Sequence, residues 1–223
     1  MRALADRGFR GISLREAVSH REAHGSWPTR CAVLTFDDGY ANVFDVAVPA
    51  LAQHGFTATV FLVTGHVGGR NDWAPPPAGL GTQPMLSWEQ VAELSAAGME
   101  VGAHTRTHPD LQRLSAAAAK EEIVTCRADI ESRLQQPVES FAYPFGRVSP
   151  ASSAIVRREF HTACTTVLRR AGPDGSHSLP RVDMYYVRSV HTFERLLSGR
   201  LDGYLAVRRW GRLVRPILTA HRE

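Results

Sequence analysis

The stretch CAVLTFDDGY, residues 31–40, joins an apolar run to two adjacent carboxylates and a glycine. Its first six residues have the length and composition of a buried β-strand. Asp37 and Asp38 follow directly, and Gly39 permits a sharp turn that lets both side chains reach one cavity. Parallel α/β proteins carry their functional residues at the carboxyl ends of strands. The stretch therefore predicts a parallel strand with a functional site at its end.

The rest of the chain alternates short apolar runs with helical patterns, which is typical of a parallel α/β fold. Two capping-box patterns, Ser13 with Glu16 and Ser87 with Gln90, predict helix starts. Further strands are expected at residues 58–63, 99–103, 141–143, 162–167 and about 182–190, and helices at residues 42–54, 88–98, 115–135 and from 150 onward.

The composition is that of an ordinary globular protein, with 223 residues, 43% hydrophobic and 22% charged. A chain of this length buries one substantial core, and no apolar run approaches the roughly 18 residues of a membrane-spanning helix. The 26 basic residues nearly balance the 22 acidic ones, and the excess lies near the C-terminus. We therefore expect no nucleic-acid partner.

The first residues, MRALADRGFRG, are charged and lack the apolar core of a signal peptide. We expect a protein of the cytoplasm or of the cytoplasmic membrane face, with export and removal of a leader as the alternative. Three widely spaced cysteines without a CxxC pair exclude a zinc ribbon and argue against a disulfide framework. Cys31 and Cys164 are expected to be small buried hydrophobes. No GxSxG motif indicates a serine hydrolase.

A second polar motif, HTRTH at residues 104–108, follows the strand-like run MEVGA. Two histidines four residues apart meet one ion if the segment turns helically. With one carboxylate they make a His₂Asp ligand set for zinc, cobalt or nickel, which leaves coordination sites open, as catalytic metals require. The second carboxylate then remains as a base. Alone, the aspartate doublet also fits a solvated turn, and the histidine pair also fits two surface histidines. Because both motifs follow predicted strands and together complete a ligand set, a shared metal site explains them better than coincidence.

Three motifs in this order, TFDDGY, GAHTRTHPDL and FAYPFG, resemble the polysaccharide deacetylases, carbohydrate esterase family 4. The resemblance extends from about Leu4 to about Val190. It implies an α/β fold, a distorted (β/α) barrel with about seven strands. We expect the catalytic domain at residues 1–195 and a helical tail at residues 196–223.

The resemblance also implies a role for individual residues. Asp37 is the catalytic base, and Asp38, His104 and His108 hold the metal, with zinc as the expected ion and cobalt or nickel as alternatives. The third motif supplies the oxyanion and substrate-binding positions Tyr143, Pro144 and Phe145. In it, the backbone N–H of Phe145 stabilises the oxyanion and Tyr143 lines the sugar site.

The third motif departs from the commonest family pattern, because Ala142 stands where an arginine usually pairs with the catalytic aspartate. FAYPFG resembles a subgroup in which the arginine follows the fifth strand, and Arg181 fits that place. No histidine stands in a clear context for the general acid. His161, His177 and His191 are each expected to be structural or exposed.

The implied reaction is hydrolysis of the N-acetyl group of an amino sugar in a glycan or glycolipid, with release of acetate. The alternatives are an O-acetyl esterase, a hydrolase of non-sugar amides, and an inactive glycan-binding homologue. The Gly- and Pro-rich loop at residues 64–84 is expected to wall a glycan groove with Trp73 and His66. Alternatively, Trp73 packs the loop onto the protein and does not contact the glycan.

The tail has a basic amphipathic pattern. Its apolar stripe comprises Val207, Trp210, Val214 and Ile217, with Arg208, Arg212 and Arg215 on another side. Such a helix fits either the surface of an anionic membrane or a docked position on the barrel wall.

Overall fold

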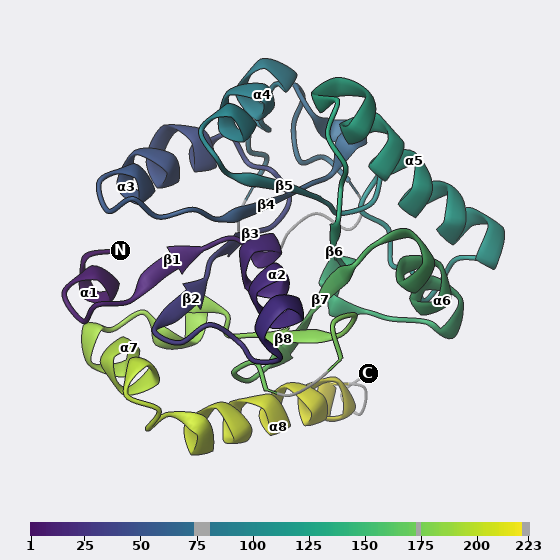
Figure 1. The fold of residues 1–223 in the computed structure, drawn as a ribbon. Helices are drawn as coiled ribbons and strands as arrows, with labels where there is room; N and C mark the ends of the chain where they lie inside the picture. The colour runs from purple at the N-terminus through teal and green to yellow at the C-terminus, as the bar shows by residue number, and fades with distance from the viewer. Residues whose placement is uncertain (74–80, 173–174, 220–223) are drawn as a thin grey trace.

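The computed structural model describes residues 1–73, 81–172 and 175–219, without the side chains of residues 212–219. Its centre is a parallel sheet that curls into a barrel-like ring with helices outside (Figure 1). The strand order in this sheet is β3-β4-β5-β6-β7-β8, and a separate parallel pair, β1-β2, lies beside it. The strands are β1 Arg10–Ile12, β2 Cys31–Val33, β3 Thr35–Phe36, β4 Thr59–Leu62, β5 Glu100–Ala103, β6 Ser140–Ala142, β7 Thr162–Leu168 and β8 Leu179–Arg181. The α/β barrel predicted from the sequence is confirmed.

Helices and short helical turns connect the strands and cover the outside of the ring. Both predicted capping boxes are present, as is the Ser149 cap before Pro150. The α-helices are α1 Arg2–Ala5, α2 Leu14–His24, α3 Val48–Ala52, α4 Trp88–Ala96, α5 Ala116–Leu134, α6 Pro150–Glu159, α7 Val190–Leu197 and α8 Asp202–Thr219. The π-helix η1 spans Val43–Ala47, and the 3₁₀ turns are η2 Thr64–His66, η3 Pro144–Gly146 and η4 Met184–Val187.

Two predicted strands differ from the structure. The run at residues 31–36 divides at Leu34, whose N–H donates to Ile12 while its carbonyl accepts from Thr59. Its first half therefore pairs with β1 and its second half with β4. The strand expected at about 182–190 is wrong. Asp183 accepts a hydrogen bond from the N–H of Tyr185 and starts the turn η4, which competes with a strand ladder.

Side chains alternate between the two surfaces of the sheet. Val60 and Leu62 face the main core under the helices, whereas Phe61 faces the inside of the ring. The inner cluster contains Ala142, Cys164 and Leu179 together with Leu14 and Val18 of α2. Helix α2 thus closes one end of the ring, and Figure 1 shows it across the centre.

A buried carboxylate holds α2 in this position. Glu100, at the start of β5, is 2% exposed and accepts hydrogen bonds from the N–H of Arg15 and the hydroxyl of Thr59. The hydroxyl of Thr59 also accepts from the N–H of Leu14. The amino terminus of a helix favours a negative charge. Because Thr59 and Glu100 begin their strands, α2 marks the amino-terminal end of the ring, and the opposite end is left for the site.

Cysteine burial differs along the chain. Cys126 and Cys164 are buried, and all three cysteines are free thiols. Cys31, which was expected to be buried, is only partly buried, because the next residue of β2, Ala32, packs against the main core and side chains alternate along a strand.

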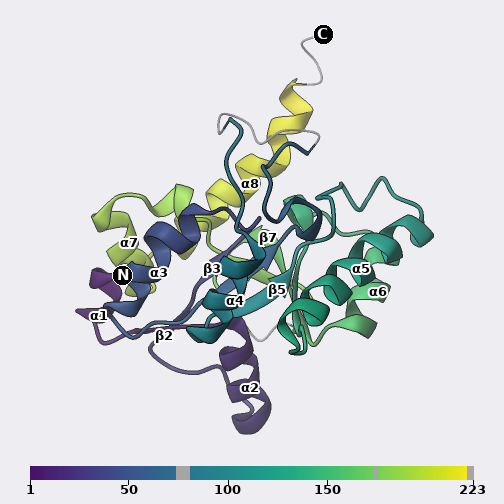
Figure 2. The same ribbon diagram turned by 90° about the horizontal axis from the view of Figure 1, so that it is seen from above.

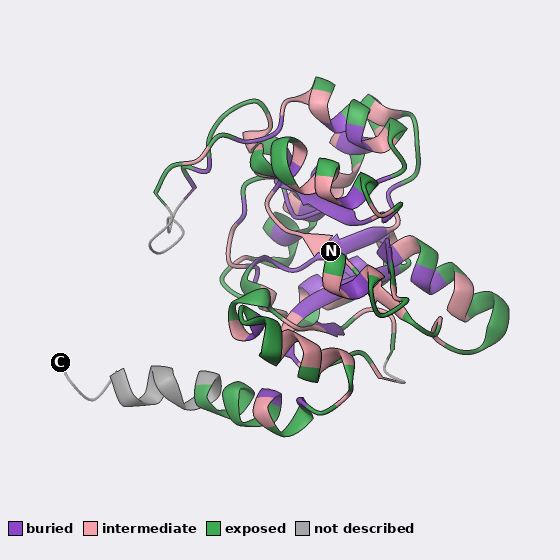
Figure 3. Cartoon of the chain, turned by 90° about the vertical axis from the view of Figure 1, so that its left-hand side faces the viewer, coloured by how far each residue is buried: buried purple, intermediate pink, exposed green. Residues whose placement is uncertain are grey.

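Helix α8 uses one face to dock and leaves another exposed. Leu201, just before it, and Leu205 are 1% exposed and pack with Leu168 and Val187. On the helix, positions 207 and 210 lie about 200° and 140° round from position 205. Val207 and Trp210 are 70% and 68% exposed, in agreement with this placement. Figure 3 shows that much of the described part of α8 is exposed. In the described part of the chain, no helix combines the length and hydropathy needed to cross a bilayer.

Candidate metal and catalytic site

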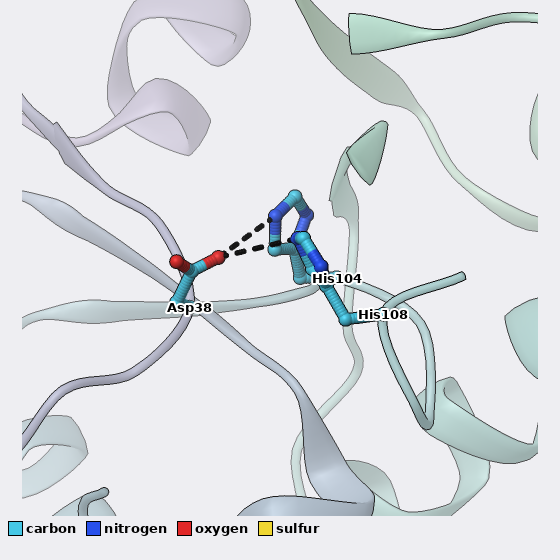
Figure 4. A group of neighbouring side chains, drawn as sticks. All are labelled: Asp38, His104 and His108. Carbon is cyan, nitrogen blue, oxygen red and sulfur yellow. Dashed lines mark ion pairs between the residues drawn. The ribbon is translucent and has the colours of Figure 1, made fainter. Parts of the chain in front are cut away.

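Three predicted ligands converge at the carboxyl ends of β3 and β5. Oδ1 of Asp38 lies 3.3 Å from Nε2 of His104 and 3.4 Å from Nε2 of His108 (Figure 4). One ligand atom from each residue lies within 4.8 Å of those from the other two. Both histidines are buried, and Asp38 is partly buried. Two imidazole nitrogens and one carboxylate oxygen around one point form a set suited to a divalent cation.

The tautomer of His104 is set by the neighbouring strand. Its Nδ1 lies 2.6 Å from the carbonyl oxygen of Ala142 at the end of β6, so Nδ1–H donates there. The lone pair of Nε2 then faces Asp38. A second hydrogen bond of this kind commonly fixes the ring of a metal-binding histidine. Ala142, the departure from the family pattern, thus contributes through its backbone.

The charges of the cluster also fit a cation. Burial raises the pKa of Asp38, but the hydrogen bond and charge of His104 outweigh this and lower it. Burial lowers the pKa of His104, yet Asp38 and Asp37 raise it overall. The pKa of His108 falls to about 4 through burial and the charge on His104. The two carboxylates therefore favour a positive charge at this point, whether from a proton on His104 or from a metal ion.

His108 is held by aromatic packing. Its Nδ1 is buried and has no hydrogen-bond partner among the described residues. The rings of Trp73 and Phe145 lie against it, at centroid distances of 4.8 and 4.7 Å. Trp73 is only 5% exposed, and its ring also contacts His66. Trp73 therefore packs its loop onto a metal-site histidine instead of presenting a ring to a sugar, which favours the second of the two interpretations of this residue.

The backbone is strained at the site. Among the described residues, six non-glycine residues have positive φ, and four of them are Asp38, Thr105, His108 and Phe145, with φ between 59° and 73°. Each such residue costs roughly 1–2 kcal/mol, and such conformations gather at functional sites. The segment between the histidines is consequently not the helical turn expected from their spacing. Left-handed conformations at Thr105 and His108 bring the two rings together instead.

The second carboxylate of the doublet is paired with the arginine expected from the resemblance. Arg181, at the end of β8, donates to both oxygens of Asp37 at 2.6 and 2.7 Å. Its Nε donates to the carbonyl of Thr165, which orients the guanidinium. Burial raises the pKa of Asp37, but the charge of Arg181 outweighs it and lowers the pKa overall. Asp37 is therefore an ionised carboxylate beside the three ligands and separate from them.

Replacing Arg181 with methionine is expected to raise the pKa of Asp37, because burial then acts without the guanidinium. The free energy of unfolding should fall by about 1.5–3 kcal/mol near neutral pH, the usual effect of lost hydrogen bonds to a charged group. Since the pKa of Asp37 is lowered in the folded chain, this difference should shrink as pH falls through it. Carboxyl ¹³C NMR titration and urea unfolding measure both effects. Arg113→Met, at a side chain 84% exposed, is the control. An unchanged titration of Asp37 contradicts the assignment.

The third motif lies at the site in part. Pro144 is buried, and Phe145 is 38% exposed with its ring against His108. The expectation that Tyr143 lines the sugar site is wrong. Its side chain is fully buried and packs edge-on against Phe141, at a centroid distance of 5.1 Å. Residues 141 and 143 point to the helix side of β6, whereas Ala142 points into the ring.

The three histidines considered for the general acid lie away from the metal ligands. His161 directly precedes β7, and Nε2 of His177 lies 2.8 Å from the carbonyl oxygen of Phe160, so both are at the amino-terminal end of that strand. This is the end opposite the metal ligands. His191 is exposed in the first turn of α7. These positions agree with the structural or exposed character expected for them.

A parallel α/β ring with two imidazoles, a ligand carboxylate and a second carboxylate at its strand ends defines the class of metal-dependent hydrolytic barrels. Residues 24–162 match the sequence model of polysaccharide deacetylases, so the chain belongs to that family. The match excludes Arg181 and includes the residues Asp37, Asp38, His104 and His108. Members of this family are metal-dependent, and Asp38, His104 and His108 form a group in this chain that could hold a metal ion.

Individual relatives agree with this assignment. The poly-β-1,6-N-acetyl-D-glucosamine N-deacetylase of Staphylococcus epidermidis is 24% identical over 204 residues, which cover 86% of this chain and 66% of that protein. The chitooligosaccharide deacetylase of Bradyrhizobium is 36% identical over 113 residues, or 48% of this chain and 42% of that protein. The chain therefore spans less than two thirds of the length of these relatives.

Among solved structures, the Streptococcus pyogenes deacetylase PplD in complex with acetate superposes with a TM-score of 0.68 at 26% identity. The match covers 81% of this chain and 76% of that one. Over most of its length, this chain therefore resembles PplD both in fold and in sequence.

Proposed function

We propose that this chain hydrolyses the N-acetyl group of an amino sugar in a glycan or glycolipid and releases acetate. The observation that carries the proposal is the convergence of Asp38, His104 and His108 beside a carboxylate held by Arg181. Two relatives whose names state N-acetylglucosamine-polymer or chitooligosaccharide deacetylation support the substrate class. The PplD structure contains acetate, the product that this reaction would release.

Zinc is the metal that we propose for the site, with cobalt or nickel as functional substitutes. Two neutral imidazoles and one carboxylate are a common ligand set for catalytic zinc, and water and substrate occupy the remaining positions. Such an ion lowers the pKa of water towards neutrality and polarises a carbonyl group.

The residues of the chain divide the remaining work. Asp37 accepts the proton of the attacking water, since it is ionised and is not one of the three ligands. Arg181 holds both oxygens of Asp37 and so orients the base. The ring of Phe145 lies against His108. The backbone N–H of Phe145 donates to the acetyl carbonyl oxygen as the attack of water turns it into an oxyanion. Trp73 and Phe145 shield the ring of His108 from solvent.

Acetate release decides between this function and its alternatives. The purified chain loaded with zinc is incubated with an N-acetylglucosamine oligomer, an O-acetylated glycan and a non-sugar acetamide. We expect acetate and a new primary amine from the oligomer. Acetate from the O-acetylated glycan alone would indicate an esterase, and acetate from the acetamide alone an amide hydrolase. Bound zinc without turnover of any of the three would indicate a glycan-binding homologue.

We further propose that α8 contacts an anionic membrane. Its exposed Val207 and Trp210 lie opposite the docked face. A bilayer could therefore contact these two side chains without displacing the helix from the barrel. Arg208 and Arg209 are exposed beside them. From residue 200 to the end the sequence has six arginines against Asp202 and Glu223, which suits an anionic surface. Helix α8 runs toward the side opposite α2, the side of the metal ligands (Figures 2 and 3).

Sedimentation with vesicles tests this contact. The full chain should bind vesicles of phosphatidylglycerol more than vesicles of phosphatidylcholine, and salt should weaken the binding. The Val207→Ser/Trp210→Ser double variant should lose most of it. Val46→Ser, at an apolar residue 67% exposed on η1, is the matched control. Vesicle binding by the double variant equal to that of the parent chain rejects the proposal. The proposal is also rejected if the parent chain is a dimer and the double variant loses dimerisation but keeps vesicle binding. The location of the protein stays a prediction from the sequence.

A further inference from the structure

The turn between the two metal-site histidines is tied to α5 at Glu122. The backbone carbonyl of Glu122 accepts a hydrogen bond from the N–H of Arg106 at 3.1 Å, and its carboxylate accepts three hydrogen bonds. Oε2 of Glu122 accepts hydrogen bonds from the backbone N–H groups of Arg106, at 2.9 Å, and Thr107, at 2.8 Å. Its Oε1 accepts from the hydroxyl of Thr107 at 2.7 Å. Through its carboxylate, Glu122 thus accepts three hydrogen bonds from two consecutive residues at the centre of the HTRTH segment. It is not one of the three converging side chains of Figure 4, and it lies outside the three motifs.

The same face of α5 also holds the neighbouring loop. Residues 122, 126 and 129 are spaced four and three apart, which places them on one side of the helix. Asp129 accepts from the hydroxyl of Thr64 at 2.7 Å, and the thiol of Cys126 lies 3.5 Å from the carbonyl oxygen of Leu62. Helix α5 therefore binds the carboxyl ends of both β4 and β5.

The loop after β4 and the loop after β5 are also hydrogen-bonded to each other. The N–H of Gly65 donates to the carbonyl of Arg106 at 2.8 Å. A Cβ atom at Gly65 would lie 2.7 Å from that carbonyl oxygen, so only glycine allows this approach. The N–H of Thr64 also donates to the carbonyl of Thr105. A shift of the histidine turn would thus have to break contacts with α5 and with the loop after β4 together.

The turn needs such restraint, because Thr105 and His108 both have left-handed backbone conformations. Within the turn, the N–H of His108 donates to the hydroxyl of Thr105 at 3.1 Å. A strained backbone persists only where the surrounding structure fixes it. The Glu122 carboxylate, which lies outside the turn, accepts three hydrogen bonds from Arg106 and Thr107.

We propose that Glu122 is a positioning residue for the metal site, which fixes the turn that aims His104 and His108 at Asp38. The inference rests on the proposed metal site only where zinc affinity is measured. It assigns a role to a residue that no sequence motif indicates, and it predicts that metal affinity depends on a carboxylate that coordinates nothing.

Zinc affinity of the full chain, measured by competition with a chromophoric chelator, tests the proposal. Glu122→Ala should weaken zinc binding about 10–100-fold, the usual effect of removing an outer support of a metal ligand. Glu122→Gln should restore most of the affinity, since its carbonyl can accept both backbone N–H groups and its amide can donate to Thr107. Glu121→Ala is the matched control, because Glu121 is exposed on the same helix and accepts from Thr125, away from the turn.

A metal-free measurement separates this inference from the proposed function. Hydrogen exchange of the peptide containing Arg106 and Thr107 should be faster in Glu122→Ala than in the parent chain or in Glu122→Gln. Faster exchange in the Glu122→Ala variant of a chain that binds no zinc would retain the positioning role and reject the metal site. Unchanged exchange together with unchanged zinc affinity in Glu122→Ala overturns the inference. Circular dichroism and the melting temperature of each variant show whether the fold is retained.

Discussion

Asp37→Asn is expected to lower the rate of acetate release by about 10²–10⁴, while zinc remains bound at full stoichiometry. The loss has this size because a positioned general base contributes about 10²–10⁴ to a rate. Asparagine has nearly the same shape but does not accept the proton of the attacking water. Zinc should remain because the three converging ligand atoms belong to Asp38, His104 and His108. Steady-state acetate assays and elemental analysis of the same preparation measure the two quantities.

Two further observations make this test specific. Asp45→Asn changes an exposed carboxylate on η1 and should leave the rate unchanged. Because the Asp37→Asn substitution removes the carboxylate that is hydrogen-bonded to the partly buried Arg181, the variant should also be less stable, which urea unfolding detects. Retained turnover in a folded, zinc-loaded Asp37→Asn variant removes Asp37 as the base. Loss of zinc from this variant would instead place Asp37 among the ligands.

His104→Ala is expected to abolish stoichiometric zinc binding and, with it, acetate release. The substitution removes one of three ligands and also frees the carbonyl of Ala142 in a buried position. We expect affinity to fall by more than the ~10–100-fold that follows the loss of an outer hydrogen-bond partner. The affinity of Glu122→Ala should therefore lie between that of the parent chain and that of His104→Ala.

Zinc content after dialysis and the visible absorption of the cobalt-loaded chain report this loss directly. His161→Ala is the control, since that histidine is exposed at the other end of the ring. Full zinc occupancy in a folded His104→Ala chain would show that the metal lies elsewhere. A concurrent loss of folding would be evident from the melting curve, and His108→Ala then serves as the second ligand variant.

Local chemistry explains which elements could be predicted from the sequence. The capping boxes at Ser13 and Ser87 depend on groups three residues apart, so neighbouring residues suffice to define them. The two site motifs were located because apolar strands lead straight into polar residues, and parallel strands bring their carboxyl ends together. The pairing of Arg181 with Asp37 came from the family resemblance and spans 144 positions in the sequence.

Contacts between distant residues decided the rest. Leu34 divides a uniform apolar run because β1 and β4 each supply a hydrogen-bonding edge, and residues 182–190 lack a strand because Asp183 turns the chain. Tyr143 is buried because β6 presents that side to the helices.

In the metal site, too, some features follow from the sequence and others only from the tertiary structure. The amino-acid order supplies its ligand types and their spacing, since these follow from residue identity. The left-handed turn of His108 and the three hydrogen bonds to Glu122 exist only once α5 lies against β5. Their energies depend on packing between segments that the sequence keeps far apart, so only the folded chain defines them.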